Sequence, residues 1–235
     1  MSPTQSAELR KIPPSKACRE VRALLCKKRA SLQIKRAFDT TASLFLLTAL
    51  SPVMAFVAAA VSADSPGGAF FFQTRLTKGA RPFKMIKFRT MTENCGGGEL
   101  TLAGDARVTR IGRVLRKYRL DELPQLYNVL AGDMSFVGPR PEVVRYLNDF
   151  SAEDRALFLV RAGVTSRTAL CFREEARLLF ADDAERVYRE RILPVKNAMA
   201  LEELKSFSLR QDLNTLCRTV LFPVLASLDE KRANR

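Results

Sequence analysis

An uncharged run early in the chain constrains the fold more than any other feature. Residues 40–63, TTASLFLLTALSPVMAFVAAAVSA, carry no charged side chain, and about 20 apolar residues are enough for a helix to cross a bilayer. Ser51-Pro52 stands near the middle of the run. Proline removes a helix hydrogen bond and clashes with the preceding turn, so we expect a break there. Each half would then have about 11 residues and a length of roughly 16 Å, the depth of one leaflet.

Three interpretations of this run compete. As a signal peptide it would be cleaved after Val61-Ser62-Ala63, but the polar region that precedes it is too long for one. As a straight transmembrane helix it would place its two flanks on opposite sides of the membrane. As a re-entrant helix with a central break it would dip into one leaflet and return, which keeps both flanks on the same side.

The charges on either side of the run favour the re-entrant helix. Bases precede it at Lys27, Lys28, Arg29, Lys35 and Arg36. Bases follow it at Arg75, Lys78, Arg81, Lys84, Lys87 and Arg89. The positive-inside rule places both flanks in the cytoplasm, and a spanning helix can satisfy only one of them.

The chain as a whole is strongly basic. Its 39 Lys and Arg against 25 Asp and Glu give a net charge of +14 over 235 residues, which calls for an acidic partner such as nucleic acid, an anionic membrane or a phosphorylated substrate. Histidine is absent, so Ser–His, Cys–His and His–metal mechanisms are excluded. The five cysteines contain no Cys-x-x-Cys pair, and a reduced, cytoplasm-facing chain fits them better than a disulfide framework.

We expect four regions and a mainly α fold with a small β-hairpin, an α+β arrangement. Residues 1–34 form a basic extension, within which a disordered start leads to a basic helix over about 16–36. Residues 35–65 form the re-entrant membrane helix, residues 66–228 a compact cytoplasmic catalytic domain, and residues 229–235 a tail.

Within the catalytic region the pattern changes from strand to helix. Residues 69–91 alternate around a turn and predict the β-hairpin, and residues 93–99, ENCGGGE, predict a loop. Helices are expected over 105–120 and 121–130, and a mainly helical stretch over 152–228.

One helix of that last stretch has two interpretations. Apolar residues recur at helical spacing at Leu201, Leu204, Leu213, Leu216 and Val220. The helix is either packed into the core or an interfacial amphipathic helix that lies on the bilayer.

The segment RKYRLDELPQLYNVLAGDMSFVGPRP, residues 116–141, sets two acids, Asp121 and Glu122, among bases. Asp121 is a good helix N-cap, with Pro124 tolerated in the first turn, so it could simply begin a helix. The free amides and nearby bases also favour the ionised carboxylate, which can attack phosphorus. Glu122 is then placed to hold Mg²⁺, which takes one or two carboxylates plus substrate phosphates.

Cationic side chains complete the pattern. Arg140 stands between two prolines, which fix its backbone, and its planar guanidinium suits a phosphate; the alternative is a rigid turn with a surface arginine. Lys84, Lys87 and Arg89 line the hairpin, or else belong to an ordinary solvated strand face. A nucleophilic carboxylate, a metal carboxylate and a cationic clamp together suit phosphoryl transfer.

Several segments carry a family resemblance: KRAFD at 35–39, SP at 51–52, KFRTM at 87–91, RVTRIGRVLRK at 107–117, LDELPQLYNVLAGDMSFVGPRPE at 120–142 and DLNTLCRTV at 212–220. They resemble the bacterial sugar transferase family, specifically its small monotopic polyprenyl-phosphate phosphoglycosyl transferases. The likeness runs from about Lys35 to Val220, and the segment at 120–142 is highly specific.

The resemblance implies an activity and a location. Such enzymes take a UDP-sugar, transfer the sugar phosphate to undecaprenyl phosphate through a covalent phosphosugar-aspartyl intermediate, and release UMP. The product starts an exopolysaccharide, capsule, O-antigen (lipopolysaccharide) or glycoprotein glycan. The resemblance further implies Mg²⁺ as cofactor, contact with membrane lipid, and the cytoplasmic face of the bacterial inner membrane; a homodimer stays open.

The resemblance also assigns roles to residues. Asp121 would be the nucleophile and Glu122 its partner, linked to the Mg²⁺. Phosphate contacts would come from Lys87, Arg89, Arg116 and Arg140. The break in the re-entrant helix would fall at Ser51-Pro52.

Two segments depart from the family pattern. The usual RPGITGL appears as Arg-Ala-Gly-Val-Thr-Ser-Arg at 161–167, which leaves the choice of sugar open. The usual Asp-Pro before RVTR appears as Asp105-Ala106.

Three other functions compete with the transferase. A non-enzymatic basic protein that binds anionic lipid or a partner at the membrane explains the charge and the apolar run, but not the acid pair. A nucleic-acid binder is not expected, because aromatic residues do not alternate with the bases as stacking platforms would. A metal-dependent Asp-x-Asp glycosyltransferase lacks its motif, since Asp182-Asp183 fits a solvated helical run.

Overall fold

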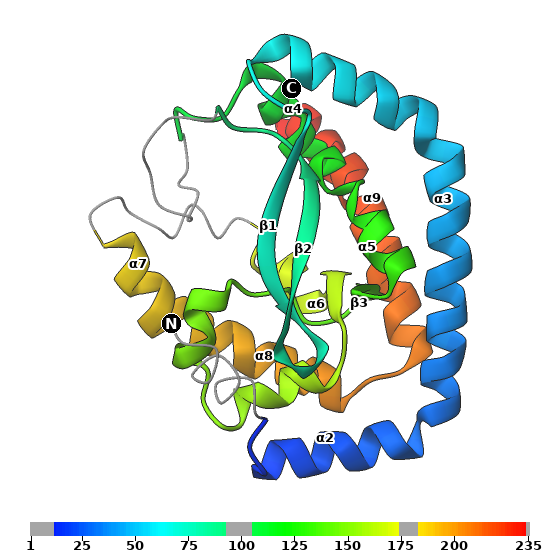
Figure 1. Cartoon of the computed structure of the whole chain (residues 1–235), viewed down its shortest axis with the longest axis vertical. Helices are drawn as coiled ribbons and strands as arrows, with labels where there is room; N and C mark the ends of the chain where they lie inside the picture. The colour runs from blue at the N-terminus through cyan, green and yellow to red at the C-terminus, as the bar shows by residue number, and fades with distance from the viewer. Residues whose placement is uncertain (1–11, 93–104, 174–182, 234–235) are drawn as a thin grey trace.

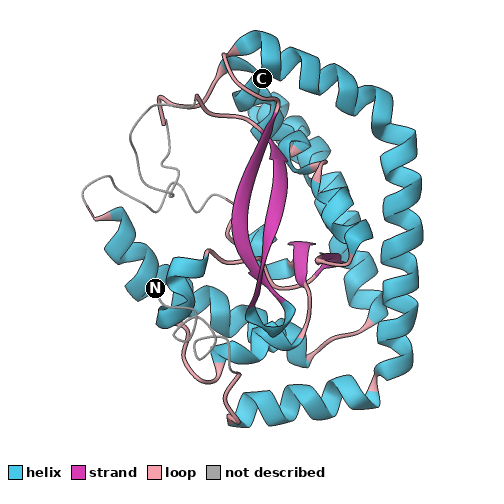
Figure 2. Cartoon of the chain, viewed as in Figure 1, coloured by secondary structure: helices cyan, strands magenta, loops and turns pink. Residues whose placement is uncertain are grey.

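The computed structural model describes residues 12–92, 105–173 and 183–233. This part of the chain is mostly helical, with two small two-stranded sheets (Figures 1 and 2). The helices are α2 (Lys16–Lys27), α3 (Arg29–Asp64), α4 (Arg110–Tyr118), α5 (Gln125–Ala131), α6 (Arg167–Cys171), α7 (Ala184–Val187), α8 (Leu193–Lys205) and α9 (Leu209–Ala233). The strands are β1 (Phe70–Thr77), β2 (Arg81–Phe88), β3 (Met134–Val137) and β4 (Ala162–Thr165). The predicted mainly α fold with a β-hairpin is confirmed, whereas the predicted loop at 93–99 lies outside the described residues.

Helix α3 carries the uncharged run and continues through Pro52 without interruption. The predicted separation into two halves is therefore wrong, and the helix instead bends along its course (Figure 1). The carbonyl of Thr48, which a residue other than proline at position 52 would bond, accepts a hydrogen bond of 2.8 Å from the Ser51 hydroxyl. The serine beside the proline thus replaces the missing bond and keeps the helix whole.

The N-terminal half of α3 is fixed to the rest of the molecule by charged side chains. Arg36 donates to the carbonyls of Val129 and Leu130, at 2.7 and 3.0 Å, and so binds carbonyls at the C-terminal end of α5. Asp39 is buried and accepts from the Ser135 hydroxyl at 2.7 Å and from the Phe136 N–H at 3.3 Å. These contacts connect the membrane-length helix to α5 and β3.

The C-terminal end of α3 is fixed to the same domain. Asp64 accepts a 3.1 Å hydrogen bond from the N–H of Ile111, in the first turn of α4. Arg89 donates to the Ser65 carbonyl at 2.7 Å and also to the Pro66 carbonyl. Between these two attachments most of the apolar surface of α3 faces outward, and Phe56 is 75% exposed.

The N-terminal basic helix differs from the prediction in its bounds. The expected helix over 16–36 is divided at Lys28 into α2 and the first turns of α3. Ala17, Cys18 and Val21 of α2 are buried in a cluster shared with β1 and α8. The basic segment is therefore amphipathic, and its apolar face forms part of the core.

The hairpin β1–β2 is antiparallel, with Phe70 opposite Phe88 and Thr77 opposite Arg81. It lies near the middle of the molecule in Figure 1, and α5 contacts both β2 and α3. This element and the helix before the acid pair are confirmed, although the helix begins at Arg110 rather than near residue 105.

The second sheet is parallel and was not predicted. β3 and β4 pair in the register Met134↔Ala162 and Val137↔Thr165. Gly138, which follows β3, comes so close to Gly163 of β4 that a Cβ on Gly163 would lie 2.2 Å from the Gly138 nitrogen. This contact needs glycine at position 163, and it fixes the start of the Gly138-Pro139-Arg140-Pro141 segment.

The C-terminal apolar pattern belongs to two helices rather than one. α8 ends at Lys205 and α9 begins at Leu209. Leu204 is buried, as the core interpretation predicts. Leu213 and Val220 of α9 are exposed, which agrees with the interfacial interpretation.

The docking of α3 predicts a stability effect. Asp39→Ala leaves the Ser135 hydroxyl and the Phe136 N–H without their charged acceptor, so we expect a loss of about 2–3 kcal/mol. For a chain of this size the midpoint of thermal unfolding in detergent would fall by about 2–4 °C per kcal/mol. Thr41→Ala, an exposed position on the same helix, is the control and should change the midpoint little. Equal midpoints for the two variants would contradict this account of the docking.

Candidate active site

The acid pair lies in a short 3-10 turn, Leu120–Glu122, between α4 and α5. The predicted helix from Asp121 is corrected, because α5 begins only at Gln125 and its N-cap is Pro124. Arg119 ends α4 with a φ of 57°, a left-handed conformation that is uncommon for a residue other than glycine. This reversal turns the chain inward, and Asp121 is only 8% exposed.

Glu122 lies inside a group of three cations that come from three different segments. Its carboxylate is 3.3 Å from the Lys87 ammonium of β2 and 3.0 Å from the Arg119 guanidinium at the end of α4. The Arg140 guanidinium, between its two prolines, lies 4.0 Å away. Glu122, Lys87 and Arg140, all candidate site residues from the sequence, thus lie together, and Arg119 joins them.

The two neighbouring carboxyl groups have pKa values shifted in opposite directions. Burial raises the pKa of Asp121 above its usual value, and the positive charge of Lys87 only partly offsets this. Burial acts on Glu122 as well, but Lys87, Arg119 and Arg140 outweigh it and lower the pKa of Glu122 to about 2. The expectation that the surroundings of Asp121 favour its ionised form is therefore corrected. Glu122 is thus the member of the pair whose pKa favours the ionised form.

Asn128 holds β2 beside the helix that follows the acid pair. Its amide nitrogen donates to the Lys84 carbonyl at 2.8 Å, and its amide oxygen accepts from the Ile86 N–H at 3.1 Å. Both contacts lie on β2 just before Lys87. A buried asparagine of α5 thus sets the position of the lysine that neutralises Glu122.

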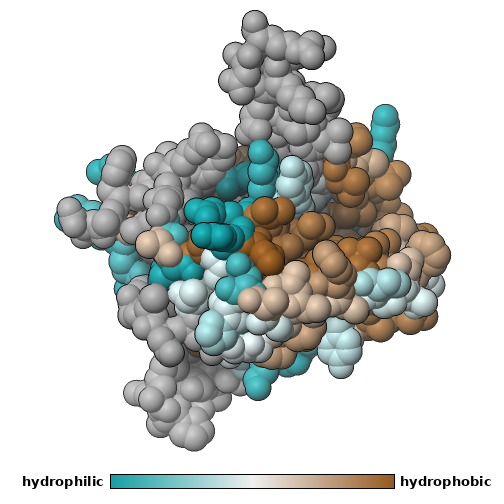
Figure 3. Space-filling view, turned by 90° about the horizontal axis from the view of Figure 1, so that it is seen from above, coloured by the Kyte–Doolittle hydropathy of each residue, from teal (hydrophilic) through white to brown (hydrophobic). Residues whose placement is uncertain are grey.

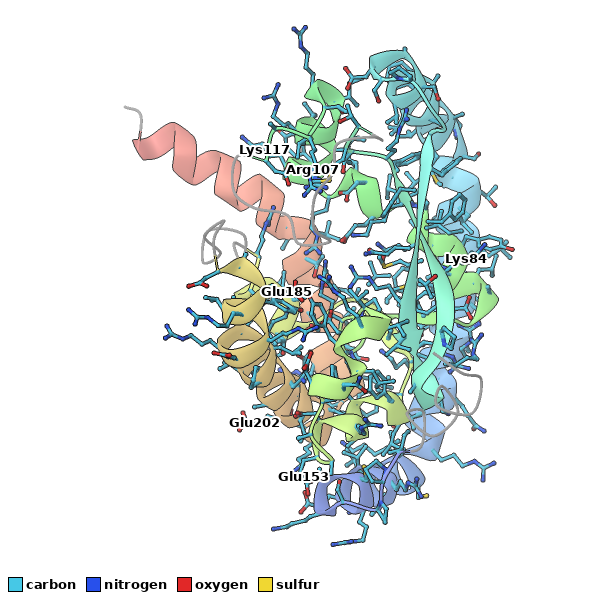
Figure 4. All side chains as sticks on the ribbon, turned by 60° about the vertical axis from the view of Figure 1, so that its left-hand side comes forward. Lys84, Arg107, Lys117, Glu153, Glu185 and Glu202 are labelled. Carbon is cyan, nitrogen blue, oxygen red and sulfur yellow. The ribbon has the colours of Figure 1, made fainter. Side chains whose placement is uncertain are left out.

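The other predicted phosphate contacts lie in different surroundings. Arg116 of α4 donates to the Thr90 hydroxyl at 2.8 Å. Its guanidinium is also attracted electrostatically by the Asp121 carboxylate. Arg89 is buried and its guanidinium binds the carbonyls after α3, so its role toward phosphate stays a prediction. Lys84, labelled in Figure 4, points outward from β2 and is exposed.

The segment around Arg140 is supported from behind by a buried network. Arg75 donates to the Pro141 carbonyl at 3.2 Å and lies 3.5 Å from the Glu142 carboxylate. Glu142 also accepts a 3.0 Å hydrogen bond from the Tyr188 hydroxyl. On the front side, Gly163 and Val164 of β4 line a small cavity together with Glu122 and Arg140. Part of the segment 161–167 therefore lines the site, although positions 162 and 166, where the family's proline and glycine are replaced, do not line this cavity.

The carboxylates suit a hard cation only if a substrate contributes further ligands. Within the described residues no group of three or more metal-ligating side chains occurs. Asp121 and Glu122 are neighbours in the sequence, and Mg²⁺ takes one or two carboxylates when phosphates supply the other ligands. The pair therefore fits the ion in the presence of a diphosphate.

Two residues of the site were missed in the sequence. The sequence shows Arg119 only as one of several bases near the acid pair. The left-handed backbone that directs its side chain toward Glu122 has no recognisable sequence pattern. Asn128 could have been noticed, since it is a polar residue among Leu126, Val129 and Leu130 in a short apolar helix.

The fold and the site define a mostly helical protein with one membrane-length helix and an acid pair buried among cations. The profile of the family described as Bacterial sugar transferase matches residues 30–225. The chain belongs to this family, whose members are membrane-associated sugar transferases.

Individual relatives agree with this assignment. A Caulobacter vibrioides protein named UDP-glucose:undecaprenyl-phosphate glucose-1-phosphate transferase is 38% identical over 200 residues, 83% of this chain and 70% of that protein. An Aeromonas hydrophila protein named UDP-N-acetylgalactosamine-undecaprenyl-phosphate N-acetylgalactosaminephosphotransferase is 45% identical over 122 residues, 51% of this chain. The match covers only 29% of that Aeromonas protein.

The pKa shifts predict how the transferase activity depends on pH. If ionised Asp121 is required, activity rises as pH increases through its raised pKa. Lys87→Met removes the strongest influence that lowers this pKa, so the midpoint of the rise should move to higher pH. Lys84→Met removes the same charge from an exposed position of β2 and should leave the midpoint in place. A lower midpoint in Lys87→Met, measured from kcat/KM against pH, would contradict the assignment.

Proposed function

We propose that the protein transfers a sugar-1-phosphate from a UDP-sugar to undecaprenyl phosphate and releases UMP, at the cytoplasmic face of the bacterial inner membrane. The observation that carries the proposal is the buried Asp121–Glu122 pair, whose pKa values are shifted apart inside a group of cations. Separated pKa values give two carboxyl groups different roles. The names of the relatives supply the class of donor and acceptor.

The chemistry proceeds through Asp121 in two displacements. Its carboxylate attacks the β-phosphorus of the donor, the bond from that phosphorus to the bridging oxygen breaks, and UMP leaves with the electron pair. A phosphate oxygen of the acceptor then attacks the same phosphorus and releases the Asp121 carboxylate. Lys87, Arg116 and Arg140 stabilise the charge on the transferred phosphoryl group.

Glu122 would hold a Mg²⁺ together with the diphosphate, and the ion would neutralise part of the phosphate charge. The side chains present in the chain do the remaining work. Glu122 keeps the cations of Lys87, Arg119 and Arg140 in one place when no substrate is bound. Burial of Asp121 excludes water from the nucleophile, which protects a covalent phosphosugar from hydrolysis.

The attachment of α3 supports a re-entrant rather than a spanning helix. A helix of 36 residues is about 54 Å long, which exceeds the thickness of a bilayer core. Yet Arg36 and Asp39 near its start and Asp64 at its end are all bonded to the same domain. A helix that crossed the membrane would carry these two attachment points to opposite sides.

The non-enzymatic alternative accounts for the site less well. A protein that only gathers anionic lipid needs exposed bases. It has no need for a buried aspartate with a raised pKa beside an ionised glutamate.

The nucleophile is tested by Asp121→Asn. UMP release from UDP-sugars in the presence of undecaprenyl phosphate and Mg²⁺ should fall by about 10³-fold or more. Asp183→Asn, at an exposed acid before α7, is the control and should keep full activity. Release of UDP instead of UMP by the unmodified protein would point to an ordinary glycosyltransferase. Unchanged UMP release by Asp121→Asn would rule out the aspartyl intermediate.

The topology is tested with native cysteines on either side of α3. Cys26 of α2 and Cys171 of α6 are both exposed. In variants that keep only Cys26 or only Cys171 of the five cysteines, an impermeant thiol reagent should leave the cysteine unlabelled on intact cells. The same reagent should label it in inverted membrane vesicles. Labelling of one cysteine from each side would establish a spanning helix.

A further inference from the structure

The first residues of β1 form an unusual apolar surface. Phe70, Phe71 and Phe72 follow each other directly and are 41%, 48% and 56% exposed. A hairpin with one face on the core normally alternates apolar and polar residues, so that only one face is apolar. Here both faces of the strand end are aromatic and partly open, which indicates that something apolar covers them.

On one side this surface is continuous with the membrane-length helix. The Phe70 ring stacks on Phe88, with centroids 5.3 Å apart and an interplanar angle of 21°. Phe88 is buried in a cluster with Val57 and Val61 of α3. Figure 3 shows a broad hydrophobic surface on the side where α3 lies, next to hydrophilic side chains.

On its other side the surface reaches the acid pair. Phe71 is directly opposite Lys87 in the hairpin register, and directly opposite residues share a face with their Cβ atoms about 5 Å apart. The Lys87 ammonium lies 3.3 Å from Glu122. Phe71 therefore lies where the apolar surface meets the cations around Glu122.

We propose that Phe70–Phe72 form the docking surface for the hydrocarbon chain of the lipid-phosphate acceptor, an inference that rests on the proposed function. The acceptor must bring a phosphate to the cations and still leave its chain in an apolar environment. Phe70–Phe72 supply this apolar environment between α3 and Lys87. A nucleotide sugar has no hydrocarbon to place there, and a bulk phospholipid in this position would set its headgroup in the path of the acceptor phosphate.

Kinetics separate this role from that of the active site. Phe71→Ser should raise the KM for undecaprenyl phosphate about tenfold, because a large apolar contact is lost. The single burst of UMP formed without acceptor and the KM for the UDP-sugar should stay unchanged. Val195→Ser, at an exposed apolar position of α8, should alter none of these quantities. A wild-type protein that gives no UMP would overturn the proposed function, whereas an unchanged acceptor KM in active Phe71→Ser would overturn the docking surface alone.

The absence of tryptophan from the sequence allows a direct second measurement. Phe71→Trp introduces a single tryptophan, whose fluorescence is measured in bilayer nanodiscs that contain brominated phospholipid. Undecaprenyl phosphate should relieve the bromine quenching of this tryptophan saturably, and Val195→Trp should be neither quenched nor affected. Quenching that undecaprenyl phosphate leaves unchanged would make bulk lipid the occupant. A response to UDP-sugar alone would indicate stacking on the nucleobase, and either result would overturn the proposal.

Discussion

The structure of the site depends on one buried negative charge. Glu122 can stay ionised inside the domain only because cations from three segments reach it, since an unpaired buried charge is costly. Lys87 comes from the hairpin, Arg119 from the end of α4, and Arg140 from the loop after β3. The hairpin, the turn and the loop are thereby fixed around the same point. Asp121, one residue earlier, receives less of this compensation, and its pKa rises.

The membrane-length helix is part of the catalytic domain rather than a detachable anchor. Arg36 and Asp39 bind backbone and hydroxyl groups of α5 and β3, the two elements that lie between the acid pair and Arg140 in the chain. At the other end Arg89 holds the chain that leaves α3, and the hairpin begins directly afterwards. In the proposed reaction, the attachment of α3 at both ends would hold the active site at a fixed distance from the bilayer. Transfer from a water-soluble donor to a lipid acceptor would require such a fixed position.

Sequence patterns predicted the parts that depend on local chemistry. The hairpin and the helix before the acid pair were correct. Lys87, Glu122 and Arg140, which the sequence singled out, lie together in the structure. The break at Pro52 was wrong because the neighbouring serine replaces the lost bond. The β3–β4 sheet was missed because two four-residue strands, far apart in the sequence, pair in parallel and leave no alternation to detect. The direction of the Asp121 shift depends on burial, which adjacent residues do not reveal.

The segment 161–167 departs from the family pattern at position 162 and keeps the glycine at position 163. The family usually has proline at position 162, whereas the N–H of Ala162 donates to the Thr77 hydroxyl at 3.3 Å, a bond that proline cannot make. That hydroxyl donates in turn to the Asp133 carbonyl at 2.5 Å, just before β3. Gly163 is kept, because its contact with the loop before Arg140 leaves no space for a side chain. The strand thus has a hydrogen bond behind the site that a proline at position 162 could not make, next to the glycine contact that positions the loop before Arg140.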